Sequence, residues 1–396
     1  MTDRPNDVRA RVPRRKDNDH TREAAQERRD FITARTGLPL DHVGAFSFDP
    51  ALTAGNIENF IGVAQVPIGL AGPLRIQGEH VNEDVYVPLA TTEGTLVASY
   101  NRGMRILTEA GGVKTTIHER FMQRAPVFHF DDARGARAFA GWVDAHMDGI
   151  RKAAEATSSV AKLSHIERYS VGPMLHLRFN YETGDAAGQN MCGKATLAAC
   201  EWIAANHPGG ARYTLSGAMD TDKKHSQLNV LHSRGARVIA EAHIPSALLK
   251  ERAGVDAATL FRARLNSFAG SVMAGSANNG MHAANGLAAL FIACGQDAAN
   301  IAESHTAMTY VRLEDEGETY YWSITLPALI VATFGGGTQL PTQGECLDIL
   351  GCRGKGKVGR FIEICAATVL AGEISLASAV VAGDWVESHD RLGRNR

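Results

Sequence analysis

The 396-residue sequence lacks an excess of charge of either sign, because 41 lysines and arginines stand against 43 aspartates and glutamates. The resulting net charge of −2 gives no reason to expect nucleic acid or an acidic membrane surface as a partner. With 44% hydrophobic and 21% charged residues, the composition is ordinary for a globular enzyme. The length exceeds that of a usual single core, so we expect more than one domain.

Cysteine is scarce, and no two cysteines form a CxxC pair. Several lie in apolar stretches that are predicted to be helical, and a disulfide framework is improbable at this chain length. A reduced, cytoplasmic protein with buried thiols explains the pattern best, and we predict no metal site. The six cysteines are Cys192, Cys200, Cys294, Cys346, Cys352 and Cys365.

A secretory signal is also missing, since the first 30 residues are highly charged and contain no apolar core. One later run, residues 364–383, carries a single charge, Glu373, and approaches the roughly 20 apolar residues that a membrane-spanning helix needs. Its frequent alanine, glycine and serine, together with the central carboxylate, favour a buried helix of a large domain. We therefore expect a soluble protein without a membrane partner.

No dinucleotide-binding fingerprint is present. Neither the glycines at 335–337 nor the segment 184–188 fits GxGxxG after a strand with an acidic residue about 20 positions later. Spacing alone therefore does not predict a nicotinamide enzyme.

The predicted secondary structure between residues 126 and 214 differs from that of the flanking segments. This stretch predicts a strand, a helix over 131–156, further strands, a second helix and a last strand. Before it, residues 21–36 predict a polar helix that ends at Gly37, and 93–108 predict another helix. After it, glycine-rich loops alternate with long alanine-rich helices. The pattern predicts a small α+β domain at 126–214 inside a larger one formed by 58–125 and 215–396, preceded by an N-terminal segment, 1–57.

Several segments place titratable side chains beside small residues. Glu93 lies between a threonine pair and a glycine at the predicted helix start, where a buried acid could donate a proton. Lys223 and Lys224 follow Asp222 and could stabilise an oxyanion. Taken alone, the first is more simply a carboxylate favoured by the helix dipole, and the second a solvated charged turn.

Two further segments contain histidines. His282 and Asn285 are three residues apart and are predicted to share a helix face. Asp297 lies in an apolar run, where a carboxylate needs a partner such as a lysine, or else caps a helix. His389 could protonate a leaving thiolate, although an ordinary surface histidine on a frayed tail is the simpler interpretation.

The order of these motifs is more specific than any one of them, and it closely resembles the hydroxymethylglutaryl-CoA (HMG-CoA) reductase family from about residue 56 to 389. The TDKK segment resembles the biosynthetic, class I-like members more than the bacterial degradative class. The eight matching segments are ENFIG at 58–62, PLATTEG at 88–94, GDAAGQNM at 184–191, TDKK at 221–224, HAAN at 282–285, GQDAA at 295–299, GGGT at 335–338 and SH at 388–389.

The resemblance implies an α+β fold: a large domain around a long central helix, with an inserted ferredoxin-like, non-Rossmann domain that binds the nicotinamide cofactor. It implies the four-electron reduction of HMG-CoA to mevalonate and CoA with two NADPH, in isoprenoid biosynthesis. It also implies a homodimer or dimer of dimers with active sites at the subunit interface, and residues 58–62 match a dimer-contact motif. Membrane-bound relatives carry an N-terminal anchor, whereas we expect a soluble form here.

The resemblance also assigns roles to positions of this sequence. Lys223 would stabilise the oxyanion, Asp297 would hold Lys223, Glu93 would supply a proton during aldehyde reduction, and His389 would protonate the departing CoA thiolate. Substrate contacts match Ser99, Asn101, Arg102, Arg124, Ser216, Asp222, Lys224, His282, Asn285 and Leu376. Cofactor contacts match Ser158, Asp185, Ala187, Gly188, Asn190, Gly335, Gly336 and Gly337.

Two departures from the family pattern leave alternatives open. Ser159 stands where the family commonly has an arginine for the NADPH 2′-phosphate, so NADH is an alternative cofactor unless Lys162 compensates. Residues 277–281 differ from the usual sequence beside the acyl pocket. The alternative functions are NAD-dependent oxidation of mevalonate, a non-catalytic CoA-binding homologue, and a thioester hydrolase that consumes no reduced cofactor.

Overall fold

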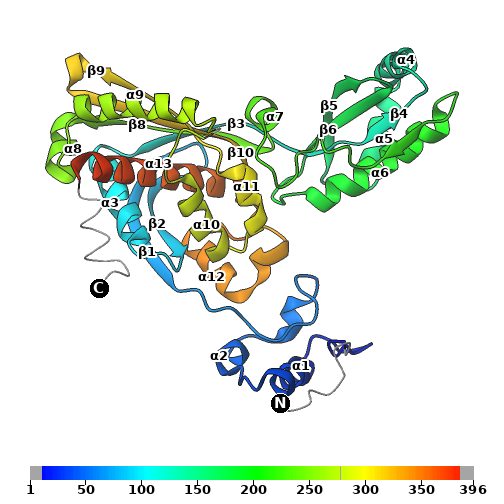
Figure 1. Cartoon of the computed structure of the whole chain (residues 1–396), viewed down its shortest axis with the longest axis horizontal. Coiled ribbons are helices and arrows are strands. Elements are labelled where there is room, and N and C mark those ends of the chain that lie inside the picture. The colour runs from blue at the N-terminus through cyan, green and yellow to red at the C-terminus, as the bar shows by residue number, and fades with distance from the viewer. Residues whose placement is uncertain (1–10, 277, 384–396) are drawn as a thin grey trace, which may run out of the picture.

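The computed structural model describes residues 11–276 and 278–383, in an α+β fold with a central body, a lobe and an N-terminal arm. Figure 1 shows the arm below the body and the lobe at the far right. The arm contains α1 (Arg22–Thr36), α2 (Asp41–Gly44) and the short helix η1 (Pro50–Thr53). As predicted, α1 ends at Gly37, which has a φ of 71°, and the side chain of Thr21 caps its start.

One open, almost wholly antiparallel sheet runs through the body and the lobe. The long strand β3 (Val113–Arg124) belongs to both, because its earlier residues pair with β8 while 122–124 pair with β6. A hairpin of β1 (Ile68–Gln77) and β2 (Asn82–Ala90) flanks β3, with β1 parallel to it. The remaining strands are β4 (Val127–His129), β5 (Lys162–Val171), β6 (Met174–Glu182), β7 (Arg212–Thr214), β8 (Gly235–Pro245), β9 (Met308–Glu314) and β10 (Thr319–Leu329).

The long helix α13 (Val358–Ala382) forms the centre of the body. It is the one helix in the described part of the chain that is long and apolar enough to cross a membrane, yet 83% of its most apolar window is buried. The prediction of a buried core helix is therefore confirmed. Its central carboxylate, Glu373, accepts hydrogen bonds from the backbone N–H groups of Met281, His282 and Ala283 at 2.7–3.2 Å, which satisfies the buried charge.

Shorter helices surround α13, and α3 approaches it so closely that a side chain on Gly103 would overlap the Ala371 carbonyl. All six cysteines are buried and unpaired, as predicted. The helices of the body are α3 (Leu96–Glu109), α7 (Gln227–His232), α8 (Ser246–Ala253), α9 (Ala257–Met273), α10 (Ala283–Ala293), η2 (Ala298–Asn300), α11 (Ile301–Ser304), η3 (Asp315–Gly317), η4 (Gly336–Gln339) and α12 (Pro341–Ile349).

The lobe follows the predicted succession of strand, helix, strands, helix and strand. The predicted helix over 131–156 is interrupted at His146, which separates α4 (Ala133–Ala145) from α5 (Met147–Glu155). After β5 and β6 comes α6 (Gln189–Asn206). The strands lie in the order β7-β4-β6-β5 with every neighbour antiparallel. Phe128, Phe139 and Phe179 lie in a hydrophobic core distinct from the one around α13.

Candidate active site

Lys223 and Asp297 form an ion pair, with Nζ 2.9 Å from Oδ2. Both side chains are a little over 40% exposed, so the pair is open to a ligand. The hydrogen bond that the Lys223 ammonium donates to Asp297 is the main reason that the pKa of Lys223 is raised, and the lysine stays charged at neutral pH. The predicted lysine partner of Asp297 is thus present. The same carboxylate also caps η2 through the Ala299 N–H, so both interpretations of Asp297 hold.

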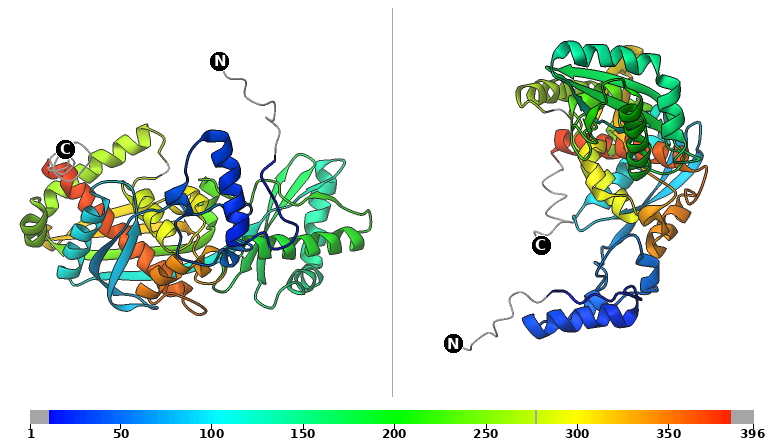
Figure 2. Two further views of the ribbon diagram at one scale, coloured as in Figure 1. Left: turned by 90° about the horizontal axis from the view of Figure 1, so that it is seen from below. Right: turned by 90° about the vertical axis from the view of Figure 1, so that its right-hand side faces the viewer.

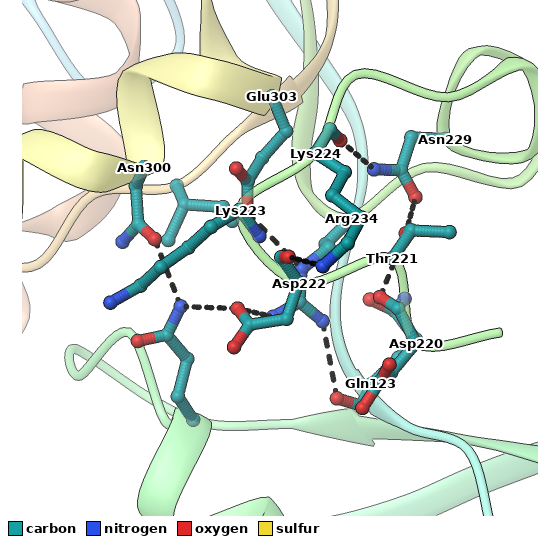
Figure 3. A network of polar contacts seen from close by, with 12 residues as sticks. Gln123, Asp220, Thr221, Asp222, Lys223, Lys224, Asn229, Arg234, Asn300 and Glu303 are labelled. Atoms are coloured by element: carbon teal, nitrogen blue, oxygen red, sulfur yellow. Dashed lines mark hydrogen bonds and ion pairs between the residues drawn. The ribbon is translucent and has the colours of Figure 1, made fainter. Parts of the chain in front are cut away.

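A buried polar network holds the backbone of Lys223 (Figure 3). The backbone N–H of Lys223 donates to Glu303 Oε1 at 3.1 Å, and Arg234 Nε donates to the same oxygen at 3.3 Å. Arg234 also binds Asp222 at 2.7 Å. Arg234 and Glu303 are 1% and 0% exposed, and burial raises the pKa of Glu303 while Arg234 opposes that shift. Sequence reasoning missed both residues, since neither lies in a matched motif.

The N-terminus of α6 meets this network. Gln189 donates through Nε2 to Asp222 Oδ1 at 3.2 Å and to Asn300 Oδ1 at 2.9 Å. The first residue of α6 therefore joins the loop that carries Lys223 to the turn that carries Asp297. Gln189 lies in 185–190, which the resemblance matches to cofactor contacts, whereas Asn300 was not predicted as a site residue.

The predicted substrate residues Arg124 and Ser216 converge on Asp220, which was not predicted. Arg124 Nη1 and Ser216 Oγ lie 2.8 Å and 3.1 Å from the same Asp220 oxygen. Lys224 is exposed, and its ammonium donates to the carbonyl of Asp222 at 2.9 Å. Ser216 and Lys224 lie in the loop that carries Lys223, and Arg124 lies at the end of β3. Arg124 and Lys224 are the cations of this group.

Most of the predicted cofactor positions surround the start of α6. Gly188 has a φ of 84°, and a Cβ there would overlap Thr183, so glycine is required. Within the described residues, no side chain caps α6, and Asn190 in its first turn is exposed. Ser158 lies beside this turn, where its hydroxyl donates to Met191 Sδ at 3.1 Å.

The glycine-rich loop at 335–337 approaches the same region from the body. The backbone of Gly337 lies so close to Gly295 that a side chain on Gly295 would overlap it. Two residues before the loop, the Thr333 N–H donates to the carbonyl of Asp185 at 3.0 Å. The carboxylate of Asp185 has other partners, because it accepts the N–H groups of 356–358 at the start of α13 at 2.7–3.2 Å. In the structure this predicted cofactor residue caps the central helix.

A second cluster of predicted residues lies around the start of α10. Asn285 Nδ2 is 3.4 Å from Glu93 Oε1, and Ser99 Oγ is 3.2 Å from His282 Nε2. Arg102 donates to Ser375 Oγ at 3.0 Å, and Ser99 contacts that same hydroxyl. The remaining two members, Asn101 and Leu376, lie on α3 and α13 respectively, Asn101 accepting the Gly72 N–H and Leu376 following Ser375.

Two local predictions about this cluster were wrong. Glu93 is not at a helix start: it is exposed in a turn, and α3 begins at Leu96 after Thr95 adopts a left-handed φ of 68°. His282 does not share a helix face with Asn285, because it is the N-cap residue of α10 and is buried. That burial lowers the pKa of His282 to about 4, so the imidazole is neutral near pH 7.

The two clusters lie at opposite ends of α10. Asn285 and its partner Glu93 are at the first turn, whereas Asp297 and its partner Lys223 follow the last turn. A helix of 11 residues spans roughly 16 Å at about 1.5 Å per residue. Within the described chain, Glu93 and Lys223 therefore belong to two separate clusters, one at each end of α10. The fourth predicted catalytic residue, His389, lies outside the described residues.

The sequence profile of hydroxymethylglutaryl-coenzyme A reductase matches residues 24–394. The chain belongs to the HMG-CoA reductase family. It is 42% identical to the HMG-CoA reductase of Pyrococcus horikoshii, over 95% of this chain and 93% of the relative. It is 37% identical to HMG-CoA reductase 1 of Dictyostelium discoideum, over 90% of this chain and 65% of that protein.

The family fold is confirmed by a solved structure. The NADPH-bound class II HMG-CoA reductase of Streptococcus pneumoniae superposes with a TM-score of 0.69 over 92% of this chain and 99% of that one, at 20% identity. The two clusters described above thus lie on an HMG-CoA reductase fold.

Proposed function

We propose that this reductase converts HMG-CoA to mevalonate and CoA with two NADPH, in isoprenoid biosynthesis. The observation that carries the proposal is the Lys223–Asp297 ion pair beside the N-terminus of α6, where no described side chain provides a cap. Reduction of a thioester or aldehyde carbonyl places negative charge on its oxygen. A permanently charged ammonium fixed by a carboxylate stabilises that oxyanion in both reductions.

Each proton transfer has an assigned donor. After the first reduction the C–S bond breaks, and His389 protonates the CoA thiolate so that it does not return to the aldehyde. During the second reduction Glu93 provides the proton that the aldehyde oxygen needs to become the alcohol of mevalonate. NADPH, when bound, supplies the hydride for each reduction.

The lobe fits a nicotinamide cofactor without a Rossmann fingerprint. The N-terminus of an 18-residue helix with no side-chain cap in the described chain presents N–H groups to a phosphate, and Gly188 lets the backbone turn there. The strands of the lobe lie in the order β7-β4-β6-β5. Along the chain, helices follow the first of these strands, β4, and the third, β6, and this arrangement supports a ferredoxin-like domain. We assign 126–214 to this inserted domain, 58–125 with 215–396 to the large substrate domain, and 1–57 to the arm.

The separation of the two clusters supports an active site shared between subunits. Glu93 of one chain would meet the partner's Lys223 in a homodimer or dimer of dimers. An exposed apolar stripe on α9, formed by Leu265, Phe268 and Val272 at spacings of three and four, supports such an interface. The arm, which stands away from the body in Figure 1 and in the right view of Figure 2, offers further surface for a partner.

The proposed enzyme class and cellular location rest on two further observations. The TDKK segment at 221–224 supports the class I-like assignment. Burial of α13 and of all six thiols supports a soluble, cytoplasmic enzyme.

An absorbance assay with HMG-CoA and either NADPH or NADH tests the function. We expect two NADPH oxidised for each HMG-CoA consumed, with mevalonate and free CoA as products. One equivalent oxidised with accumulation of aldehyde would contradict a four-electron reduction. Release of CoA without cofactor oxidation would indicate a thioester hydrolase, and activity only with mevalonate and NAD would indicate the catabolic direction.

A further inference from the structure

A buried ion pair on the lobe faces the body near the end of α7. Arg178 on β6 is 0% exposed, and its Nη1 lies 2.9 Å from Oε2 of Glu167 on β5. Burial acts to raise the pKa of Glu167, but its hydrogen-bond partners and the charge of Arg178 lower it to about 2, so the pair is ionised at neutral pH. Neither residue belongs to the predicted catalytic, substrate or cofactor positions.

The same guanidinium reaches from the lobe to the body. Its Nη2 donates to the backbone carbonyl of Ser233 at 2.7 Å. Ser233 follows α7 directly, and its φ of 58° is uncommon for a residue with a side chain. His232, the last residue of α7, lies with Nδ1 3.4 Å from Oε1 of Glu167. Both members of the lobe pair therefore contact the end of α7, which stands where the body meets the lobe in Figure 1.

The body holds the other side of this turn. The hydroxyl of Ser233 donates to Glu119 Oε1 at 2.6 Å, and Glu119 lies on β3. Arg237 on β8 donates through Nη2 to the carbonyl of Val230 at 2.6 Å, which fixes the last turn of α7. The turn at Ser233 is therefore held from the body by Glu119 and from the lobe by Arg178.

This turn leads directly to the network that holds Lys223. Arg234 is the next residue after Ser233, and its guanidinium lies 2.7 Å from Asp222 and 3.3 Å from Glu303. Glu303 in turn accepts the backbone N–H of Lys223. A displacement of the Ser233 backbone would therefore move Arg234, and with it the groups that hold the Lys223 loop.

The helix α7 provides a second connection to the same loop. Asn229 in α7 is buried and accepts a hydrogen bond from the hydroxyl of Thr221. Its Nδ2 also donates to the carbonyl of Lys224 at 3.5 Å, as Figure 3 shows. These two contacts lie on either side of Lys223 in the sequence, so a shift of α7 would also reach the loop.

The orientation of the lobe matters for the proposed reaction. The proposed cofactor site belongs to the lobe, whereas Lys223 belongs to the body. The sheet joins the two through a short ladder, in which residues 122–124 of β3 pair with β6. Domains of one chain move relative to each other unless their interface is large and apolar. Because a misplacement of reacting groups by about 1 Å can cost roughly 10²-fold in rate, contacts that fix the lobe affect hydride transfer.

We propose that Arg178 and Glu167 are positioning residues for hydride transfer. Through Ser233 and Arg234 they set the orientation of the cofactor lobe relative to the Lys223 loop. Arginine suits this position, because its planar guanidinium donates to a carboxylate and to a carbonyl at the same time. The proposal rests on the function proposed above, since it concerns the distance between bound NADPH and the carbonyl that Lys223 polarises.

Steady-state kinetics of Glu167→Gln and Arg178→Met in the full chain test this proposal. We expect kcat for HMG-CoA reduction to fall about tenfold in Glu167→Gln and about 10²-fold in Arg178→Met, with both KM values within about twofold of normal. The isotope effect on kcat with deuterated NADPH should rise in both variants, because hydride transfer becomes the slow step. Asp144→Asn breaks an ion pair with Arg168 inside the lobe and is the matched control, which should keep a normal kcat.

Backbone hydrogen exchange over residues 221–234 measures the same contact without depending on activity. We expect faster exchange there in Glu167→Gln and Arg178→Met than in the unmodified chain or in Asp144→Asn, because the turn after α7 opens more often. If Arg178→Met fails to fold, which circular dichroism detects, Glu167→Gln decides the question.

The two proposals fail in different ways. An unmodified chain that oxidises no NADPH with HMG-CoA would overturn the proposed function, and the role in hydride transfer with it. An active unmodified chain whose folded Glu167→Gln variant has a normal kcat would overturn the positioning role alone, and a lowered melting temperature in that variant would identify a purely structural ion pair. Unchanged hydrogen exchange over residues 221–234 would also overturn the positioning role.

Discussion

At the scale of single residues, Lys223 depends on groups that lie far from it in the sequence. Its φ of 54° is uncommon for a residue with a side chain, and its N–H is held by the buried Glu303. Its ammonium is held by Asp297, 74 positions later. The conformation that directs the ammonium toward a ligand is therefore maintained by contacts from the 297–303 segment.

We expect Lys223→Ala to reduce kcat by about 10²–10³ or more while the protein stays folded, because one charged oxyanion donor is removed. Steady-state assays with NADPH, together with circular dichroism, measure this. Near-normal turnover would move the oxyanion role to Lys224.

Glu303→Gln should act through Lys223. The amide keeps the shape of the side chain but loses the charge that pairs with buried Arg234, so we expect kcat to fall about tenfold with little change in the KM for HMG-CoA. Glu345→Gln, on an exposed surface, is the control. A purely structural role for Glu303 would lower the melting temperature and leave the kcat of the folded enzyme unaltered.

His282 makes stability depend on pH. Burial lowers its pKa to about 4, whereas the unfolded chain has a value of about 6.5. Between these values the unfolded state binds a proton that the folded state does not, so the free energy of unfolding falls as pH decreases from about 6.5 to 4. The loss approaches about 3 kcal/mol and levels off below about pH 4.

Urea unfolding at pH 7 and pH 4.5 measures this dependence. His282→Gln should remove that part of it, and the exposed control His118→Gln should retain it. A pH profile that is the same in both variants would show that His282 is not the responsible group.

At the scale of secondary-structure elements, we expect the loop between α5 and β5 to govern cofactor choice in the proposed site, because it contains Ser159. Lys162 would be a substitute for the missing arginine, but its ammonium lies 3.1 Å from Glu155 Oε2 and is already paired. The first residue of β5 therefore offers no unpaired ammonium to a 2′-phosphate.

We expect Ser159→Arg to raise kcat/KM for NADPH about tenfold and to leave the value for NADH nearly unchanged, because only NADPH carries the phosphate that arginine binds. Ser170→Arg, exposed further along β5, should change neither value. An equal gain for both cofactors would indicate a general electrostatic effect in place of 2′-phosphate recognition.

The sequence predicted the elements best where their boundaries are local. Thr21 and Gly37 mark both ends of α1, and composition alone identified α13 as a buried helix. The start of α3 was misplaced because Thr95 adopts a left-handed conformation, which a threonine rarely does and which propensity therefore does not predict. The break at His146 was missed for a similar reason, since no glycine or proline marks it.

At the scale of the whole molecule, the shared-site proposal makes a prediction for mixed subunits. Glu93→Gln and Lys223→Ala homodimers should each be nearly inactive. In a mixed dimer, one of the two sites receives an intact Glu93 and an intact Lys223, so random mixing of the two variants should restore about a quarter of normal activity. The measurement is activity after mixing under conditions of subunit exchange, with each variant mixed with itself as the control. No recovery, despite exchange shown by tagged subunits, would place both residues in one chain's site.

The sequence by itself determined the family, the four candidate catalytic side chains and the succession of elements in the lobe. Residue types, their order and local periodicity carry that information, because caps and amphipathic patterns depend on neighbours within a few positions. The tertiary structure confirmed that Asp297 pairs with Lys223, and it alone decided that Asp185 caps α13, that Glu303 and Arg234 support the Lys223 loop, and that Glu93 and Lys223 belong to clusters at opposite ends of α10. These contacts join segments tens to more than a hundred residues apart. They arise from the order in which strands pair and helices pack, and no local pattern encodes that order.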